Sequence, residues 1–338
     1  MAKKQLAASI SGERRHSWQF AAAVRTAVGC LGVMLLTALI VLPVTPQFRF
    51  ADQLKPIGEG IFGREGPVDV LFVGTSRTMA AVVGRELERN LEERLGRPVV
   101  IYDLATSGRG TDVDYLVVKE VLERSPVRLV VAEYSATSLT SNHFYFTQAA
   151  SWSDLFMNSW IFDDPFSRFA AAVRLKLSMF MTQMASDQRF VPPKVLATAE
   201  TYDYSAPRGP NEARIREAMA MGRQPQQRLR LGEPRNLIQD TYVRKMIDIV
   251  RSQDGELVLM LMPGLVDQPL PVRERRRLSK FFGVDVIGLN KADLAAFTPH
   301  HYADERHHGK LAAALYMPLL ADWIAPKLIS HVAKQLSQ

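Results

Sequence analysis

The chain has 338 residues, of which 47% are hydrophobic and 23% are charged. These proportions are typical of a globular protein that buries a core. The length exceeds one typical domain and fits either one large α/β unit with appendages or two domains. The only cysteine, Cys30, excludes an intrachain disulfide and a cysteine-based metal site.

The net charge of +7 does not indicate a nucleic-acid surface, because five basic residues and one acidic residue within residues 1–25 supply four of those charges. The one dense basic run, residues 273–280 (RERRRLSK), is more typical of a solvated helix face than of a contact with anionic lipid or polysaccharide. We therefore expect no nucleic-acid partner.

An uncharged apolar stretch follows this basic start. Residues 26–48 contain no charged side chain and are long enough to cross a hydrocarbon core of about 30 Å as a helix. The preceding basic residues mark the cytoplasmic side. A cleaved signal peptide is the alternative, but the stretch lacks a clear cleavage site and ends in Pro43 and Pro46. The sequence thus predicts a single-pass protein of a bacterial inner membrane, with a cytoplasmic arm (1–25), a transmembrane helix (26–48), a linker (49–66) and a periplasmic domain (67–338).

Beyond the linker, short β-branched runs alternate with helical periodicity, which is typical of an α/β domain. Strands are predicted at residues 68–74, 99–104, 128–133, 256–262 and 284–289. A helix at 79–95 ends at Gly96, and another ends near Glu123. Nearly continuous apolar strands separated by helices indicate a five-stranded parallel sheet covered on both faces.

A mostly helical insertion is predicted at about residues 136–250, between the third and fourth strands. Asp164 and Pro165 form a cap and first-turn pair for a helix with an apolar face. Its basic residues exclude a second membrane span. Packing against the sheet is the favoured interpretation of this helix, and an amphipathic helix lying on the membrane or on a partner is the alternative.

A serine follows the first predicted strand, in Gly74-Thr75-Ser76-Arg77. Ligands of parallel sheets bind at the carboxyl ends of the strands, so a hydroxyl there points into a cleft. The free amides at the start of the next helix favour developing negative charge. By itself this serine is more often a helix N-cap.

A second motif lies far downstream, just before the last helix. Asp304 precedes His307 by three residues, a spacing at which the carboxylate can orient the imidazole and stabilise its protonated form. His308 competes with His307 as a base. His300, His301, His307 and His308 with Asp304 could instead bind zinc, but adjacent histidines on a loop usually point apart and no HExxH pattern accompanies them. We predict neither a metal nor a cofactor.

These blocks, in this order, resemble the SGNH hydrolase superfamily. The resemblance covers about residues 68–324 without the insertion, and it rests on Gly74-Thr75-Ser76-Arg77, Gly108 and Asp304-Glu305-Arg306-His307. It implies a flavodoxin-like three-layer sandwich in which Ser76 is the nucleophile, His307 the base and Asp304 its orienting acid. It also implies an oxyanion hole formed by the Ser76 and Gly108 amides.

The chain departs from the superfamily at the third block. In place of Gly-x-Asn-Asp after the third strand it has Glu133-Tyr134-Ser135-Ala136-Thr137-Ser138, and an asparagine comes only later, at Asn142. Asn142 or Ser135 could supply the third oxyanion donor. Arg77 is a candidate for binding an anionic or sugar group of the substrate.

With its predicted membrane anchor, the chain is most similar to the branch that includes alginate O-acetylation proteins and the D-alanine transfer protein. The resemblance implies an O-acyltransferase that transfers acetyl groups, or an esterase, acting on a cell-envelope polysaccharide, with a membrane-bound O-acyltransferase as partner. The alternative is a catalytically inactive scaffold or glycan-binding partner of such an acyltransferase, which the altered third block favours.

Overall fold

The computed structural model describes residues 67–105, 110–135, 150–185, 211–222, 229–233 and 236–336, together with Gly29 and Phe146. The chain divides into two compact units, Met1–Gln47 and Phe48–Gln338, and every described residue except Gly29 belongs to the second. The predicted arm, transmembrane helix and linker lie outside the described residues apart from Gly29, so these assignments stay predictions.

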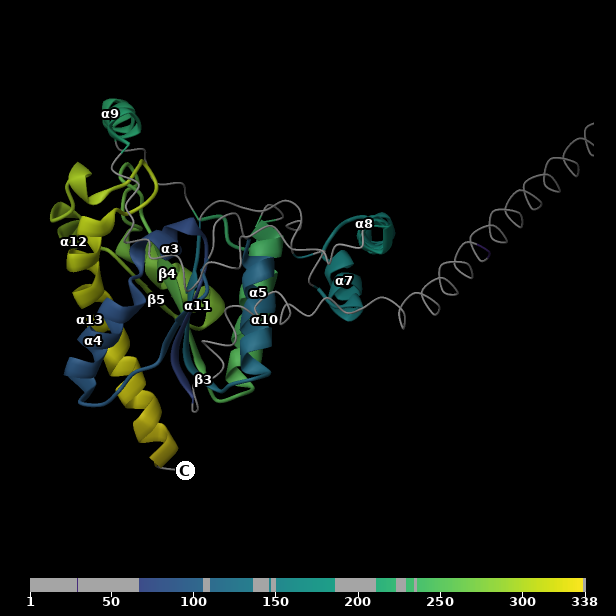
Figure 1. The fold of residues 1–338 in the computed structure, drawn as a ribbon, viewed down its shortest axis with the longest axis horizontal. Coiled ribbons are helices and arrows are strands. Elements are labelled where there is room, and N and C mark those ends of the chain that lie inside the picture. The colour runs from purple at the N-terminus through teal and green to yellow at the C-terminus, as the bar shows by residue number, and fades with distance from the viewer. Residues whose placement is uncertain are drawn as a thin grey trace, which may run out of the picture. The chain divides into compact units, whose positions relative to one another are not determined.

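Five parallel strands form the centre of the second unit (Figure 1). They are β1 (Val68–Val73), β2 (Ile101–Asp103), β3 (Val127–Glu133), β4 (Glu256–Leu261) and β5 (Asp285–Gly288). Their order is β2-β1-β3-β4-β5, and each neighbouring pair is parallel. This is the flavodoxin-like order. The predicted five-stranded sheet is confirmed, with strand ends that differ from the prediction by one or two residues.

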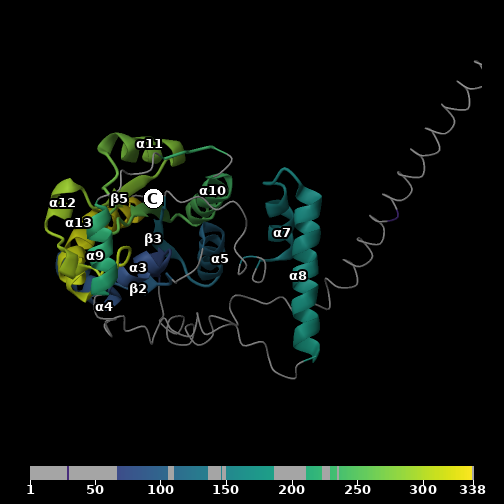
Figure 2. The same cartoon turned by 90° about the horizontal axis from the view of Figure 1, so that it is seen from above.

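Helices cover both faces of the sheet, as Figures 1 and 2 show. On one face α5 (Thr111–Leu122), α10 (Leu237–Arg251) and α11 (Val272–Phe282) share a core with Leu71, Val130 and Leu259. On the other face α4 (Gly84–Leu95), α12 (Lys291–Ala295) and α13 (Lys310–Leu336) share a second core with Val70, Val131 and Met260. Because successive strand residues point to opposite faces, near-continuous apolar strands are needed to fill both cores.

The helix predicted at 79–95 is in fact two helices, so this prediction was wrong. α3 (Ser76–Ala81) ends before Val82 and Val83, which have extended backbone conformations, and α4 begins at Gly84. The two β-branched residues suit an extended link, and Val82 is 5% exposed within the second core. The predicted end at Gly96 is confirmed, since Gly96 has a left-handed backbone with φ of 64°.

The insertion contains α7 (Trp152–Ser159), α8 (Pro165–Ala185) and α9 (Glu212–Met221). The Asp164 cap is confirmed, because its Oδ1 accepts a hydrogen bond of 3.2 Å from the Ser167 amide. α8 packs along α7, and Phe169 is partly buried against the first core. α10, which falls within the last predicted residues of the insertion, packs on α5 and β4 as the crossover helix of the sheet.

One helical stretch in the described part of the chain, Lys310–His331 within α13, is long and apolar enough to cross a membrane. Half of its most apolar window is buried within the domain. Side chains such as Tyr316, Leu320 and Ile324 are at most 1% exposed in the second core. This stretch is therefore accounted for as a core helix of the sandwich.

Candidate active site

The turn after β1 presents Ser76 at the carboxyl end of the sheet. Thr75 is the N-cap of α3, and its hydroxyl accepts a hydrogen bond of 3.2 Å from the Arg77 amide. Ser76 is thus the first residue of the helix, and the capping role expected for a serine in this position belongs to Thr75. No residue among those described accepts a hydrogen bond from the Ser76 amide, which lies at the start of α3.

A tight loop before α13 carries the other two residues. Tyr302 and His308 pair as an antiparallel bridge, and the Ala303 amide donates to the His307 carbonyl over 2.9 Å. Within the loop, Asp304 Oδ1 accepts from the amides of Arg306 at 2.8 Å and His307 at 3.0 Å. Such a turn, in which a carboxylate binds amides two and three residues ahead, fixes its own side chain as well as the backbone.

The structure brings Ser76, Asp304 and His307 together. His307 Nε2 lies 2.7 Å from Ser76 Oγ, and His307 Nδ1 lies 2.9 Å from both carboxylate oxygens of Asp304. An ionised Asp304 accepts the Nδ1 proton, which leaves Nε2 to accept the proton of the Ser76 hydroxyl. This is the geometry of a Ser-His-Asp triad, in which the imidazole can remove a proton from the hydroxyl as it attacks a carbonyl.

Asp304 is held in its ionised form. Burial acts to raise the pKa of its carboxyl, but hydrogen bonds from the Arg306 amide and from His307, with the charge of His307, outweigh burial and lower the pKa below its usual value. The carboxylate is therefore charged at neutral pH and can stabilise an imidazolium at His307.

His308 points away from Asp304 into the second core. Its ring is stacked between Tyr302 and Tyr316, with centroid distances of 4.9 Å and 5.8 Å, and Phe297 contacts its edge. It is 2% exposed, and neither ring nitrogen has a hydrogen-bond partner among the described residues. Of these two adjacent histidines, His307 is the one that faces the serine.

The burial of His308 makes a prediction about stability in acid. Burial above all, with the positive charges of Arg77, His307 and His301, lowers its pKa from 6.5 to about 3. Between these values the unfolded chain binds a proton that the folded chain does not. The neutral, buried His308 therefore contributes its full share to the free energy of unfolding above pH 6.5. Below pH 6.5 that free energy decreases by at most about 1.4 kcal/mol for each unit by which the pH is lowered.

We expect His308→Phe to lack this part of the pH dependence. As the pH falls from 6 to 5, the free energy of unfolding of the wild type should fall by up to about 1.4 kcal/mol more than that of the variant. Urea unfolding at pH 7, 6 and 5 measures it. Parallel curves for the two proteins would show that His308 is protonated in the folded state or is not buried.

Arg77, a candidate for substrate binding, lies partly covered beside the loop after β4. Its Nη1 donates to the Met262 carbonyl at 3.2 Å and lies 3.4 Å from Asp267 Oδ2. The side chain of Arg77 is 24% exposed. The same loop supports the triad loop, because the Leu265 amide donates to the Glu305 carbonyl over 3.0 Å. Sequence reasoning missed this loop, which carries no motif.

Two of the predicted oxyanion residues, Gly108 and Asn142, lie outside the described residues, so their positions stay predictions. Ser135, the other candidate for a third donor, follows Tyr134, and its carbonyl accepts a hydrogen bond of 2.8 Å from Gln239. α10 therefore holds the backbone immediately after β3 in place.

The histidines do not gather around a common point in the part of the chain that the structure describes. His301 Nδ1 accepts from the Thr298 amide at 2.9 Å, His308 is in the core, and His307 faces Ser76. Within the same residues no group of three or more His, Cys, Asp or Glu side chains could hold a metal ion.

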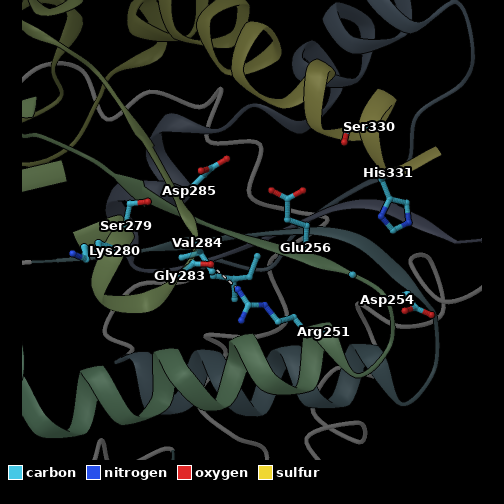
Figure 3. Close-up of a pocket in the computed structure, with 12 residues that line it drawn as sticks. Arg251, Asp254, Glu256, Ser279, Lys280, Gly283, Val284, Asp285, Ser330 and His331 are labelled. Atoms are coloured by element: carbon cyan, nitrogen blue, oxygen red, sulfur yellow. Dashed lines mark hydrogen bonds between the residues drawn. The ribbon is translucent and has the colours of Figure 1, made fainter. Parts of the chain in front are cut away.

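A polar cavity of about 780 Å³ lies at the other end of the sheet (Figure 3). Its walls include the amino ends of β4 and β5, with Arg251, Asp254, Glu256 and Lys280. Both acidic and basic side chains line it, and Glu256 and Asp285 are paired with Lys327. The triad lies at the carboxyl ends of the strands, so this cavity is separate from it.

The fold and site define an α/β protein with a serine, a histidine and an aspartate in contact. No model of a known protein family matches the chain, and no curated protein matches it. Among solved structures it is similar to a lipase/acylhydrolase from Enterococcus faecalis, with 13% identity over 77% of this chain and 97% of that one, at a TM-score of 0.35. It is also similar to the lipase Lip_vut3 from a goat rumen metagenome, with 11% identity over 75% of this chain and 96% of that one, at a TM-score of 0.32.

Proposed function

We propose that the chain is a serine-dependent O-acyltransferase or esterase of the SGNH type that acts on a cell-envelope polysaccharide outside the cytoplasmic membrane. The observation that supports it best is the 2.7 Å contact between Ser76 Oγ and His307 Nε2, with Asp304 on the other ring nitrogen. A hydroxyl, a base and an orienting carboxylate in series are what nucleophilic acyl transfer requires.

The proposed reaction has two steps. Ser76 Oγ attacks the carbonyl carbon of an acyl ester while its proton passes to His307 Nε2, and His307 then gives that proton to the departing alcohol. An acyl group, in our proposal acetyl, remains on Ser76. In the second step His307 removes a proton from a sugar hydroxyl or from water, whose oxygen attacks the acyl-serine carbonyl. The bond from the acyl carbon to Ser76 Oγ breaks, His307 returns the proton to Oγ, and the acylated sugar or free acid is released.

Negative charge on the carbonyl oxygen would be stabilised at the start of α3. The Ser76 amide is placed for this, and the amides at a helix N-terminus favour negative charge. Gly108 and Asn142 are the proposed further donors, and Arg77 the proposed contact to an anionic or sugar group. Transfer is favoured over hydrolysis by the predicted anchor at residues 26–48, which would hold the site beside a membrane-bound O-acyltransferase.

The test of this function is the O-acetyl content of the envelope glycans in cells that carry Ser76→Ala in place of the wild-type chain. We expect the acetyl content to fall. Ser279→Ala, at the opposite end of the sheet, is the matched control and should leave it unchanged, and immunoblots of membranes verify equal protein levels. A rise would indicate an esterase instead of a transferase. An unchanged acetyl content would favour the inactive scaffold.

A further inference from the structure

The last residue of β3, Glu133, carries a buried carboxylate whose hydrogen bonds among the described residues all come from Thr75 and Thr78, in the turn that bears Ser76. Glu133 is 5% exposed. Its Oε2 accepts hydrogen bonds from the Thr75 amide at 2.8 Å, the Thr75 hydroxyl at 2.8 Å and the Thr78 hydroxyl at 2.7 Å. These donors lie on both sides of Ser76 in the sequence.

The carboxylate also sets the direction of the Thr75 hydroxyl. Because that hydroxyl has one proton and donates it to Glu133, its lone pairs are left to accept from the Arg77 amide, at 3.2 Å. Glu133 thereby determines which way the N-cap of α3 points. Ser76 lies between Thr75 and Arg77, the two residues that these bonds connect.

Gly74 permits this close approach. A Cβ atom at Gly74 would lie 2.6 Å from Glu133 Cβ and 2.9 Å from Glu133 Oε2, distances that real Cβ atoms do not show. A side chain at position 74, two residues before Ser76, would therefore collide with Glu133 on the neighbouring strand, which accounts for the glycine there. β1 and β3 pair directly, with Val73 opposite Ala132, which places the ends of the two strands side by side.

We propose that Glu133 is a positioning residue for the nucleophile, and that its carboxylate aligns Ser76 with His307 through Thr75 and Thr78. This inference rests on the proposed function and deepens it. It gives a role to the residue that begins the altered block after β3. A buried carboxylate with three donors is rigid, and small displacements of a reacting group have large effects on rate.

The first test is the rate at which a fluorophosphonate probe labels the full chain in detergent, with rates expressed per folded molecule. We expect Glu133→Ala to lower the rate by about 100-fold, because it leaves three donors unpaired and the turn free to shift. Glu133→Gln keeps the shape and an acceptor oxygen, and should recover labelling to within about tenfold of wild type. A purely structural role would lower the folded fraction but would leave the rate per folded molecule unchanged.

Asp69→Asn is the matched control. Asp69 is also a buried carboxylate, 2% exposed, at the other end of β1, where it accepts from Arg97, Arg128 and the Val100 amide. This variant should lose stability and keep its labelling rate per folded molecule. If Glu133→Ala does not fold, Thr78→Val removes a single donor with little change in shape, and we expect it to slow labelling by about tenfold.

A second readout separates this inference from the proposed function. In a Cys30→Ser background, Ser76→Cys places a thiol beside His307, and its alkylation by iodoacetamide at different pH values reports the thiolate directly. Pairing with His307 should bring the alkylation midpoint below the value of about 8.5 for a free thiol. Adding Glu133→Ala or Thr78→Val should move the midpoint back towards that value, whereas adding Asp69→Asn should not.

The outcomes are distinct. A wild-type chain inert to the fluorophosphonate, with an alkylation midpoint that responds to Glu133→Ala, would overturn the proposed function and keep the inference. The inference would be overturned and the function kept if the fluorophosphonate labels the wild-type chain but neither Glu133→Ala nor Thr78→Val, in folded protein, changes the labelling rate or the alkylation midpoint. A midpoint that responds equally to Asp69→Asn would also overturn the inference.

Discussion

Replacing Ser76 with alanine is expected to lower the turnover of a small acetyl ester by about 10⁶-fold and to abolish labelling by a fluorophosphonate. The proposed reaction passes through an acyl group on Ser76 Oγ, and the only other function of the side chain in the described contacts is its hydrogen bond to His307. The fold should survive, since Ser76 is partly exposed and alanine is favourable in the first turn of a helix.

The measurement is ester hydrolysis by the purified full chain, with thermal unfolding to verify the fold. Ser279→Ala should match wild type in both assays. Turnover that is reduced less than about tenfold by Ser76→Ala, in a folded protein, would show that another group attacks the ester.

Replacing His307 with alanine is expected to have an effect almost as large, about 10⁶-fold on turnover. Among the described residues His307 alone is hydrogen-bonded through its side chain to both Ser76 and Asp304, so its removal leaves the hydroxyl without the proposed base. Ester turnover by the purified full chain at pH 8 measures the effect, with thermal unfolding to verify the fold.

Two other histidines provide controls. His331→Ala, beside the cavity at the opposite end of the sheet, should keep wild-type turnover. His308→Phe should keep most of the turnover because the ring replaces one that is stacked among aromatics in the core. If His308→Phe and not His307→Ala abolished turnover in folded protein, the assignment of the base would be reversed.

Much of the sheet was predictable because its central strands β1, β3 and β4 are buried on both faces. Val68–Val73 and Val127–Glu133 are apolar runs bounded by turn residues, and such runs have few other stable arrangements. The break between α3 and α4 was not predictable in this way. Val82 and Val83 fit helical spacing as well as they fit an extended link, and the packing of Val82 in the core decides between them.

The triad residues could be chosen from the sequence, but their contact could not. Asp304 and His307 lie three residues apart, so a tight turn alone brings them together. Ser76 lies 231 residues before His307, and only the sheet order brings them within 2.7 Å. In the sequence, Glu133 begins the block that departs from the third motif of the SGNH superfamily. Its contacts with Thr75 and Thr78 could not be predicted, because they depend on the pairing of β1 with β3.

The long separation between Ser76 and His307 has a consequence for biogenesis. During synthesis the serine is made early, but His307 follows only in the last tenth of the polypeptide. The proposed reactivity towards an ester would therefore appear only when synthesis is nearly finished, and a covalent probe would count only molecules that have folded after that point.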